Sequence, residues 1–173
     1  MYILGLNAYH ADSSAAIFKD GVMIAATEEE RFRRVKHWAG FPSMAIQFCL
    51  DEVGIKLEEV DHIAIGRDVN AKYLKKWLYL LTHPMDIKGV IDRSKNASKV
   101  SSLEEEFYKL DNTVSKEKIS KKIHYVEHHR AHLASAFFAS PFEESALLSI
   151  DGSGDFSTTM IGTGSGNQIK IID

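Results

Sequence analysis

The sequence predicts an α/β fold in which one layer is followed by the beginning of a second, similar layer. Short apolar runs alternate with helical patterns along most of the 173 residues. Residues 146–173 repeat the order of residues 2–27, which is an apolar strand, a polar turn, a strand, a tight turn and a strand. A repeat of this kind, at a separation of about 145 residues, indicates a duplicated architecture with two layers facing each other across a cleft.

The first three predicted strands come from residues 2–28, where each apolar run is about five or six residues long. Lys19, Asp20 and Gly21 supply the positive-φ turn of a hairpin between the second and third strands. Pro42 then ends the extended path, and Ser43 is placed to cap a helix. The predicted apolar face of that helix is made by Met44, Ile46, Phe48, Leu50 and, in part, Val53.

The remaining elements complete a ribonuclease-H-like order of three strands, helix, strand, helical stretch, strand and helix. They are a strand at 61–68, a polar helical stretch at 70–110, a strand at 121–127 and a helix at 128–140. We expect residues 1–139 to form the first ribonuclease-H-like layer and residues 140–173 the truncated start of the second. The last strands would then expose an apolar face, which the rest of a longer polypeptide or a partner, such as a second copy in a homodimer, would cover.

The composition excludes several broad classes of protein. With 21 basic and 24 acidic residues and a net charge of −3, the chain has no general attraction for nucleic acid or an anionic membrane. Its N-terminus lacks a basic signal-peptide region, and no segment reaches the length of a membrane span. The single Cys49 excludes an internal disulfide and is expected to be a buried, inert thiol. The sequence thus predicts a cytoplasmic protein.

Three histidines near the start of the last helix carry the strongest chemical signal. His128 and His132 are four residues apart, so they project from one helix face at a spacing suited to a divalent metal ion. Asp151, at the tip of the following strand, can add a carboxylate ligand. His129 points about 100° away and would contact substrate or pack. The alternative from spacing alone is that these histidines only cap and pack the helix.

Three stretches of the sequence resemble the O-carbamoyltransferases of the nodulation-protein and antibiotic-tailoring type. They are "ILGLNAYHADSSAAIFKDG", "AATEEERFRRVKHWAGFP" and "HHRAHLASAFFASPFEESALLSIDGSGD". They reach both ends of the chain and leave mainly residues 67–120 without recognisable motifs. The amino-terminal domain of that family is similar to the tRNA threonylcarbamoyl-transferase fold, within the actin, hexokinase and heat-shock-ATPase group. The resemblance therefore implies the same duplicated α/β fold as the strand pattern.

The resemblance implies a metal, expected to be iron, with His128, His132 and Asp151 as its ligands and a further aspartate from later sequence. Complete enzymes of the family move a carbamoyl group from carbamoyl phosphate to an acceptor hydroxyl of a small molecule. They use ATP to form a carbamoyl-adenylate in a separate carboxy-terminal domain. The chain would be the first half of the transfer domain and, by itself, inactive.

Residues in two loops and near the predicted metal site complete the expected site. His10 is the candidate general base beside Asp12, while Lys36 and His37 match the family motif and would clamp carbamoyl or phosphate oxygens. The alternative for His10 is a loop histidine without a role. The alternative for Lys36 and His37 is that they belong to a solvated charge run. The residues expected to bind nucleotide or phosphate, partly because glycine-rich backbone can receive anions, are Asn7, Ser13, His129, Arg130, Gly152, Ser153 and Gly154.

Three other functions stay open at the level of sequence. A sugar-kinase-like ATP-binding domain of the same fold would hold ATP between its two hairpins without a histidine-bound metal. A tRNA threonylcarbamoyl transferase would favour a more basic surface than a net charge of −3 provides. The third is a folded domain with no activity.

Overall fold

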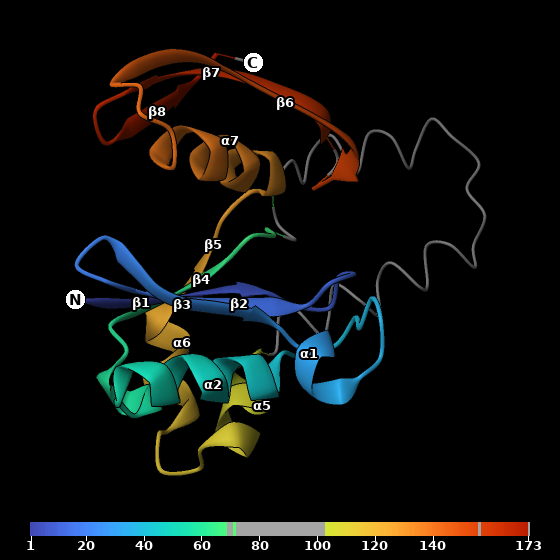
Figure 1. Cartoon of the computed structure of the whole chain (residues 1–173), viewed down its shortest axis with the longest axis vertical. Coiled ribbons are helices and arrows are strands. Elements are labelled where there is room, and N and C mark those ends of the chain that lie inside the picture. Colours follow the sequence, from blue (N-terminus) through green and yellow to red (C-terminus); the bar gives the residue numbers. More distant parts are fainter. Residues whose placement is uncertain (69–70, 72–102, 156, 173) are drawn as a thin grey trace. The chain divides into compact units, whose positions relative to one another are not determined.

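The computed structural model describes residues 1–68, 71, 103–155 and 157–172 (Figure 1). The chain divides into two compact units, the first made of Met1–Ile65 and Asp86–Tyr125, the second of Gly66–Met85 and Val126–Asp173. Among the described helices, none has both the length and the apolar character needed to cross a membrane.

A mixed five-stranded sheet forms the centre of the first unit, with the strand order β3-β2-β1-β4-β5. Strand β1 pairs antiparallel with β2 and parallel with β4, and β4 pairs parallel with β5. This order is that of a ribonuclease-H-like layer, so the predicted fold class and five-stranded sheet are confirmed. The strands are β1 Tyr2–Asn7, β2 Ser14–Lys19, β3 Val22–Glu28, β4 His62–Ile65 and β5 Ile123–Tyr125.

The described helices α2, α5 and α6 lie on one side of this sheet (Figure 1). Leu4 and Ile17 pair across β1 and β2 and are fully buried, as is Ile46 of α2. Cys49 on the same helix is also buried, and burial raises the pKa of its thiol to about 11, as suits an inert thiol. The helices are α1 Glu30–Arg33, α2 Ser43–Val53, α5 Leu103–Leu110 and α6 Lys116–Lys122, with a 3₁₀ turn at Leu57–Glu59.

Helix α2 starts and ends for reasons that the sequence shows only in part. The expected cap, Ser43, is instead the first helical residue, and Pro42 precedes it without a side-chain cap. The free N–H of Ala45 is satisfied from outside the helix by the buried carboxylate of Glu29, at 2.8 Å. At the other end, Gly54 adopts a φ of 73° and donates to the carbonyl of Leu50.

The described residues of the second unit form an antiparallel three-stranded sheet and the helix α7, His128–Phe138. Its strands are β6 Glu144–Gly154, β7 Ser157–Ser165 and β8 Gln168–Ile171. Leu133 and Phe137 of α7 pack with Leu147 and Met160 in a separate core. Because this core needs α7, the boundary falls after Tyr125 and not at residue 139 as the sequence indicated.

The register of the two sheets repeats at the separation that the sequence repeat predicts. Leu4 faces Ile17 in the first sheet, and Leu148 faces Ile161 in the second. Leu4 is 0% exposed and Leu148 is 62% exposed, because α2 covers the first pair and no described helix covers the second. The expected apolar face is therefore present, and its exposed residues are Leu148, Ile150, Ile161 and Ile172.

Replacing Gly164 by alanine should destabilise the second unit, because the added Cβ would meet the ring of buried Phe137 at 2.6 Å. Overpacking of this kind costs about 1–3 kcal/mol of the free energy of unfolding, which urea denaturation followed by circular dichroism measures. Gly5→Ala is the matched control, because its Cβ would meet only a carbonyl at 3.8 Å. An equal loss of stability in both variants would contradict the packing described for α7.

Candidate active site

The first turns of α7 bring two imidazoles together. His128 and His132 occupy positions i and i+4, and their Nε2 atoms are 3.0 Å apart. Their ring centroids are 4.5 Å apart and the rings are nearly perpendicular. The convergence predicted from the spacing is confirmed.

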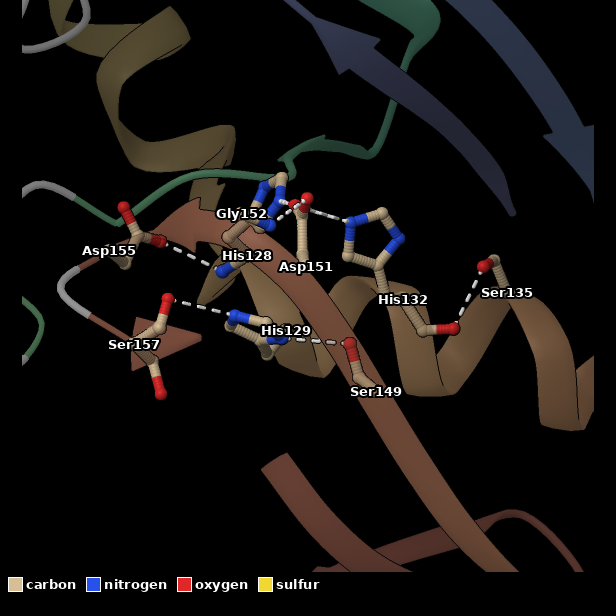
Figure 2. Close-up of polar contacts among 9 residues, drawn as sticks. All are labelled: His128, His129, His132, Ser135, Ser149, Asp151, Gly152, Asp155 and Ser157. Atoms are coloured by element: carbon tan, nitrogen blue, oxygen red, sulfur yellow. Dashed lines mark hydrogen bonds and ion pairs between the residues drawn. The ribbon is translucent and has the colours of Figure 1, made fainter. Parts of the chain in front are cut away.

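Asp151 of β6 completes the cluster from the sheet (Figure 2). Its Oδ2 atom lies 2.8 Å from His128 Nε2 and 3.6 Å from His132 Nε2. Side chains alternate along a strand, so Asp151 shares the α7 side of β6 with the buried residues Leu147 and Ser149. The helix and the strand that pack on each other thus supply all three groups.

The distances within this cluster fit a divalent metal ion. One ligand atom from each of His128, His132 and Asp151 lies within 4.8 Å of the other two. Ligands about 2.1 Å from an ion are separated by about 3.0 Å in octahedral and about 3.4 Å in tetrahedral geometry, and the observed separations are 2.8, 3.0 and 3.6 Å. Imidazole nitrogen with carboxylate oxygen is a donor set suited to zinc or iron.

The carboxyl group of Asp151 is held in its charged form. The hydrogen bond from His128 and then the backbone N–H of Gly152, at 2.5 Å, lower the pKa of Asp151 to about 2. An ionised carboxylate is the form that binds metal. Asp151 is therefore ready to act as a ligand at any pH near neutrality.

Asp155 fixes the start of α7. Its Oδ2 accepts hydrogen bonds from the backbone N–H groups of His128 and Asp68, each at 2.8 Å. A carboxylate at a helix N-terminus satisfies a free N–H group and interacts well with the helix dipole. The position of His128 is thereby tied to the end of β6.

His129 has a different role from the phosphate contact predicted for it. The side chain is fully buried, with Nδ1 2.8 Å from Ser149 Oγ and Nε2 3.0 Å from the carbonyl oxygen of Ser157 (Figure 2). Both ring nitrogens are therefore occupied within the protein, and the phosphate prediction is corrected. His129 joins α7 to β6 and β7 beside the cluster.

The other predicted phosphate-binding residues of this unit stay predictions. Arg130 is exposed, and Gly152 has open space where a side chain would stand. Ser153 and Gly154 lie in β6, but the Ser153 side chain is outside the described structure.

The first unit brings together the loop after β1 and the loop after α1. Asp12 and His37 come from these loops, and Asp12 Oδ1 lies 2.8 Å from His37 Nδ1. His10 and Lys36 are exposed in the same two loops. The carboxylate that the sequence placed beside His10 is thus paired with His37.

Two residues predicted to bind phosphate, Asn7 and Ser13, make hydrogen bonds that hold these loops in shape, and the prediction for Asn7 stays a prediction. Asn7 donates from its side-chain amide to the carbonyl oxygens of Ala11 and Asp12, at 3.0 and 3.1 Å. Ser13 is 1% exposed, and its hydroxyl donates to Gly40 O at 2.8 Å and accepts from Gly40 N. The prediction that Ser13 binds phosphate is corrected, because its buried hydroxyl already joins the two loops.

Glu29 and Arg33 support the loop that carries His37, and the sequence pattern did not single them out. The carboxylate of Glu29 is fully buried and accepts from Arg33 Nε at 2.7 Å. Arg33 in turn lies over the ring of Trp38, 4.4 Å from its centroid. The i, i+4 spacing of Glu29 and Arg33 was the available signal, but it stood inside what looked like a solvated charge run.

A family model described as the carbamoyltransferase N-terminus matches residues 2–172. The chain belongs to this family. It is 40% identical to the uncharacterized protein sll1178 of Synechocystis over 97% of this chain and 28% of that protein. It is 35% identical to the nodulation protein NolNO of Sinorhizobium fredii over 95% of this chain and 23% of that protein. The chain thus spans about a quarter of the length of these relatives.

Among solved structures, the chain is similar to YeaZ from Pseudomonas aeruginosa, with a TM-score of 0.49 and 17% sequence identity. That similarity covers 100% of this chain and 64% of the YeaZ chain.

His132→Ala should lower the affinity for Co²⁺ or Zn²⁺ at least about tenfold, because it removes a direct ligand. Isothermal titration calorimetry of the 173-residue chain at pH 7.5 measures this affinity. We expect even the unsubstituted chain to bind weakly, since the described residues supply only three ligand atoms. His124→Ala is the control, because His124 is also exposed and lies 2.9 Å from another imidazole, that of His62. An equal or larger loss in the control would place the metal elsewhere.

Proposed function

We propose that this chain is the transfer part of an ATP-dependent carbamoyltransferase whose acceptor is a hydroxyl group of a small molecule. The convergence of His128, His132 and Asp151 in a chain of this family is the observation that carries the proposal. The proposed donor is carbamoyl phosphate, activated as carbamoyl-adenylate. In this proposal the activation step belongs to another part of a longer polypeptide, in keeping with relatives about four times as long as the chain.

The proposed cofactor is iron, held by the two histidines of α7 and the carboxylate of Asp151 together with a further ligand from later sequence. A divalent ion at such a site supplies Lewis acidity, which orients a phosphate and polarises a carbonyl oxygen. The protein's own contribution is geometric. Asp155 and His129 fix α7 against β6, and this packing brings the three ligand atoms close together.

The first unit would supply the proton transfer and part of the anion binding. Lys36 carries a positive charge on an exposed loop, where an ammonium group can bind carbamoyl or phosphate oxygens. Its neighbour His37 has an imidazole paired with a carboxylate, the usual arrangement of a general acid or base. His10 lies in the loop that carries this carboxylate.

The experiment uses the full-length protein with labelled carbamoyl phosphate, ATP and a panel of hydroxylated small molecules. Two steps are measured separately, namely carbamoyl-phosphate-dependent exchange of pyrophosphate into ATP and transfer of label to an acceptor. His132→Ala should reduce transfer at least about a hundredfold while leaving the exchange intact, because the cluster is assigned only to transfer. His124→Ala is the matched control and should retain both steps.

Two results would contradict the proposal. One is transfer at the unsubstituted rate by the His132→Ala protein. The other is exchange of pyrophosphate that does not depend on carbamoyl phosphate, which would favour a different adenylating or phosphorylating activity on the same fold.

A further inference from the structure

We propose that Asp12 and His37 form a catalytic dyad in which Nε2 of His37 takes the proton of the acceptor hydroxyl. This assignment rests on the proposed carbamoyl transfer and gives the role of general base to His37, where the sequence suggested His10. Both members of the dyad belong to the first unit. Neither is part of the cluster of His128, His132 and Asp151.

The geometry of the pair determines which nitrogen is available. Asp12 Oδ1 lies 2.8 Å from His37 Nδ1, so the carboxylate accepts the Nδ1–H hydrogen bond. A neutral imidazole has one N–H group, and its other nitrogen, here Nε2, then carries the lone pair. The His37 side chain is 77% exposed, so Nε2 is accessible to a substrate. A carboxylate that orients an imidazole in this way is the arrangement used in hydroxyl activation.

The backbone holds the two partners in unusual conformations. Asp12 has a φ of 60° and His37 a φ of 55°, in the left-handed region that non-glycine residues rarely adopt. Strain of this kind persists only where the surroundings enforce it. Its occurrence at both members of one hydrogen-bonded pair points to a site whose geometry is imposed.

Several hydrogen bonds enforce that geometry by joining the two loops. Tyr9 N donates to Gly40 O and Ser13 N donates to Trp38 O, each at 3.0 Å. The buried Ser13 hydroxyl adds two further contacts with Gly40. His37 N donates to Glu30 Oε2 at 3.1 Å, so the histidine is also fixed from α1.

Contacts of the Trp38 ring hold the loop after α1, which carries His37, in place. One contact is the Arg33 guanidinium over the ring, and another is Gly40, where any Cβ would lie 2.8 Å from the indole nitrogen. The buried carboxylate of Glu29 holds Arg33 in place. The two loops are thus held by the buried residues Ser13 and Glu29, while the His37 ring is exposed.

The charged groups around His37 favour proton uptake. The hydrogen bond to Asp12 and the negative charges of Asp12, Glu30 and Glu28 raise the pKa of His37 above its usual value of about 6.5. Lys36 is its cationic neighbour in the chain. A raised pKa makes His37 a stronger base, and the neutral form needed for catalysis becomes dominant only as the pH rises through that pKa.

The proposed step balances as an acyl transfer. The O–H bond of the acceptor breaks and its proton moves to His37 Nε2. The acceptor oxygen forms a bond to the carbamoyl carbon, the bond from that carbon to the phosphate oxygen breaks, and AMP leaves with the electron pair. His37 becomes an imidazolium that the Asp12 carboxylate stabilises.

The first test uses only the 173-residue chain and does not depend on the reaction. Long-range ¹H–¹⁵N NMR identifies the tautomer and the pKa of each labelled histidine, with His37→Gln assigning the resonances. We expect the Nδ1–H tautomer for neutral His37 and a pKa that falls towards about 6.5 in Asp12→Asn. Asp20→Asn is the control, because Asp20 is an exposed carboxylate paired with the chain's own N-terminus. An Nε2–H tautomer, or a pKa unmoved by Asp12→Asn, would overturn the dyad.

The second test measures transfer by the full-length protein as a function of pH. His37→Gln should lower kcat for transfer by about 10²–10⁴-fold and flatten the acidic limb of the pH profile, with pyrophosphate exchange unchanged. Asp12→Asn should shift that limb to lower pH. A loss confined to His10→Gln would make His10 the base and overturn the dyad while carbamoyl transfer stands. If the unsubstituted protein transfers nothing, the proposed function fails, and the NMR result still decides whether the dyad is formed.

Discussion

A single buried carboxylate, Glu29, holds together the part of the first unit that supports the loops of Asp12 and His37. Its oxygens accept from Arg33 Nε and from the N–H of Ala45 at the start of α2. Removing a carboxylate from water is costly unless charged and hydrogen-bonding partners replace the solvent, and here both are present. The pairing of α1 with α2 and the support that Arg33 gives to Trp38 follow from that requirement.

In the second unit, the carboxylate of Asp155 has a similar structural role. This carboxylate accepts a hydrogen bond from the first N–H of α7 and so fixes the position of His128 relative to β6. The strand register then decides which face carries Asp151, because a slip of one residue would turn every side chain of β6 to the other face. Leu147 and Ser149, both buried on the α7 side, keep that register. Hydrophobic packing between α7 and β6 and the Asp155 helix cap therefore bring His128, His132 and Asp151 together.

The sequence predicted the elements and the cluster well because both depend on local periodicity. Short apolar runs separated by turn residues predicted the strands and their repeat, and the i, i+4 spacing predicted the pairing of His128 with His132. Asp151 could be predicted as a ligand because it lies in β6, the strand that follows α7 in the chain. The resemblance to carbamoyltransferases added the family, which the match over residues 2–172 shows.

Local sequence patterns do not predict contacts between segments that are distant in the chain. Burial of Glu29, burial of His129 and the pairing of Asp12 with His37 each depend on how loops and helices pack, which periodicity does not encode. The same holds for the boundary after Tyr125, since only the packing of Phe137 on the second sheet assigns α7 to it. The charged run around Glu29 predicts a solvent-exposed surface. Glu29 is instead fully buried and is the most buried charged residue among the described residues of the first unit.

Anomalous diffraction would show whether α7 and β6 together build a metal site. Crystals of the chain soaked in Fe²⁺ or Co²⁺ under anaerobic conditions would be measured on both sides of the metal absorption edge. We expect one dominant peak about 2.1 Å from His128 Nε2, His132 Nε2 and an Asp151 oxygen. A dominant peak at another site, such as the exposed His62 and His124 pair, with none at the cluster would contradict it.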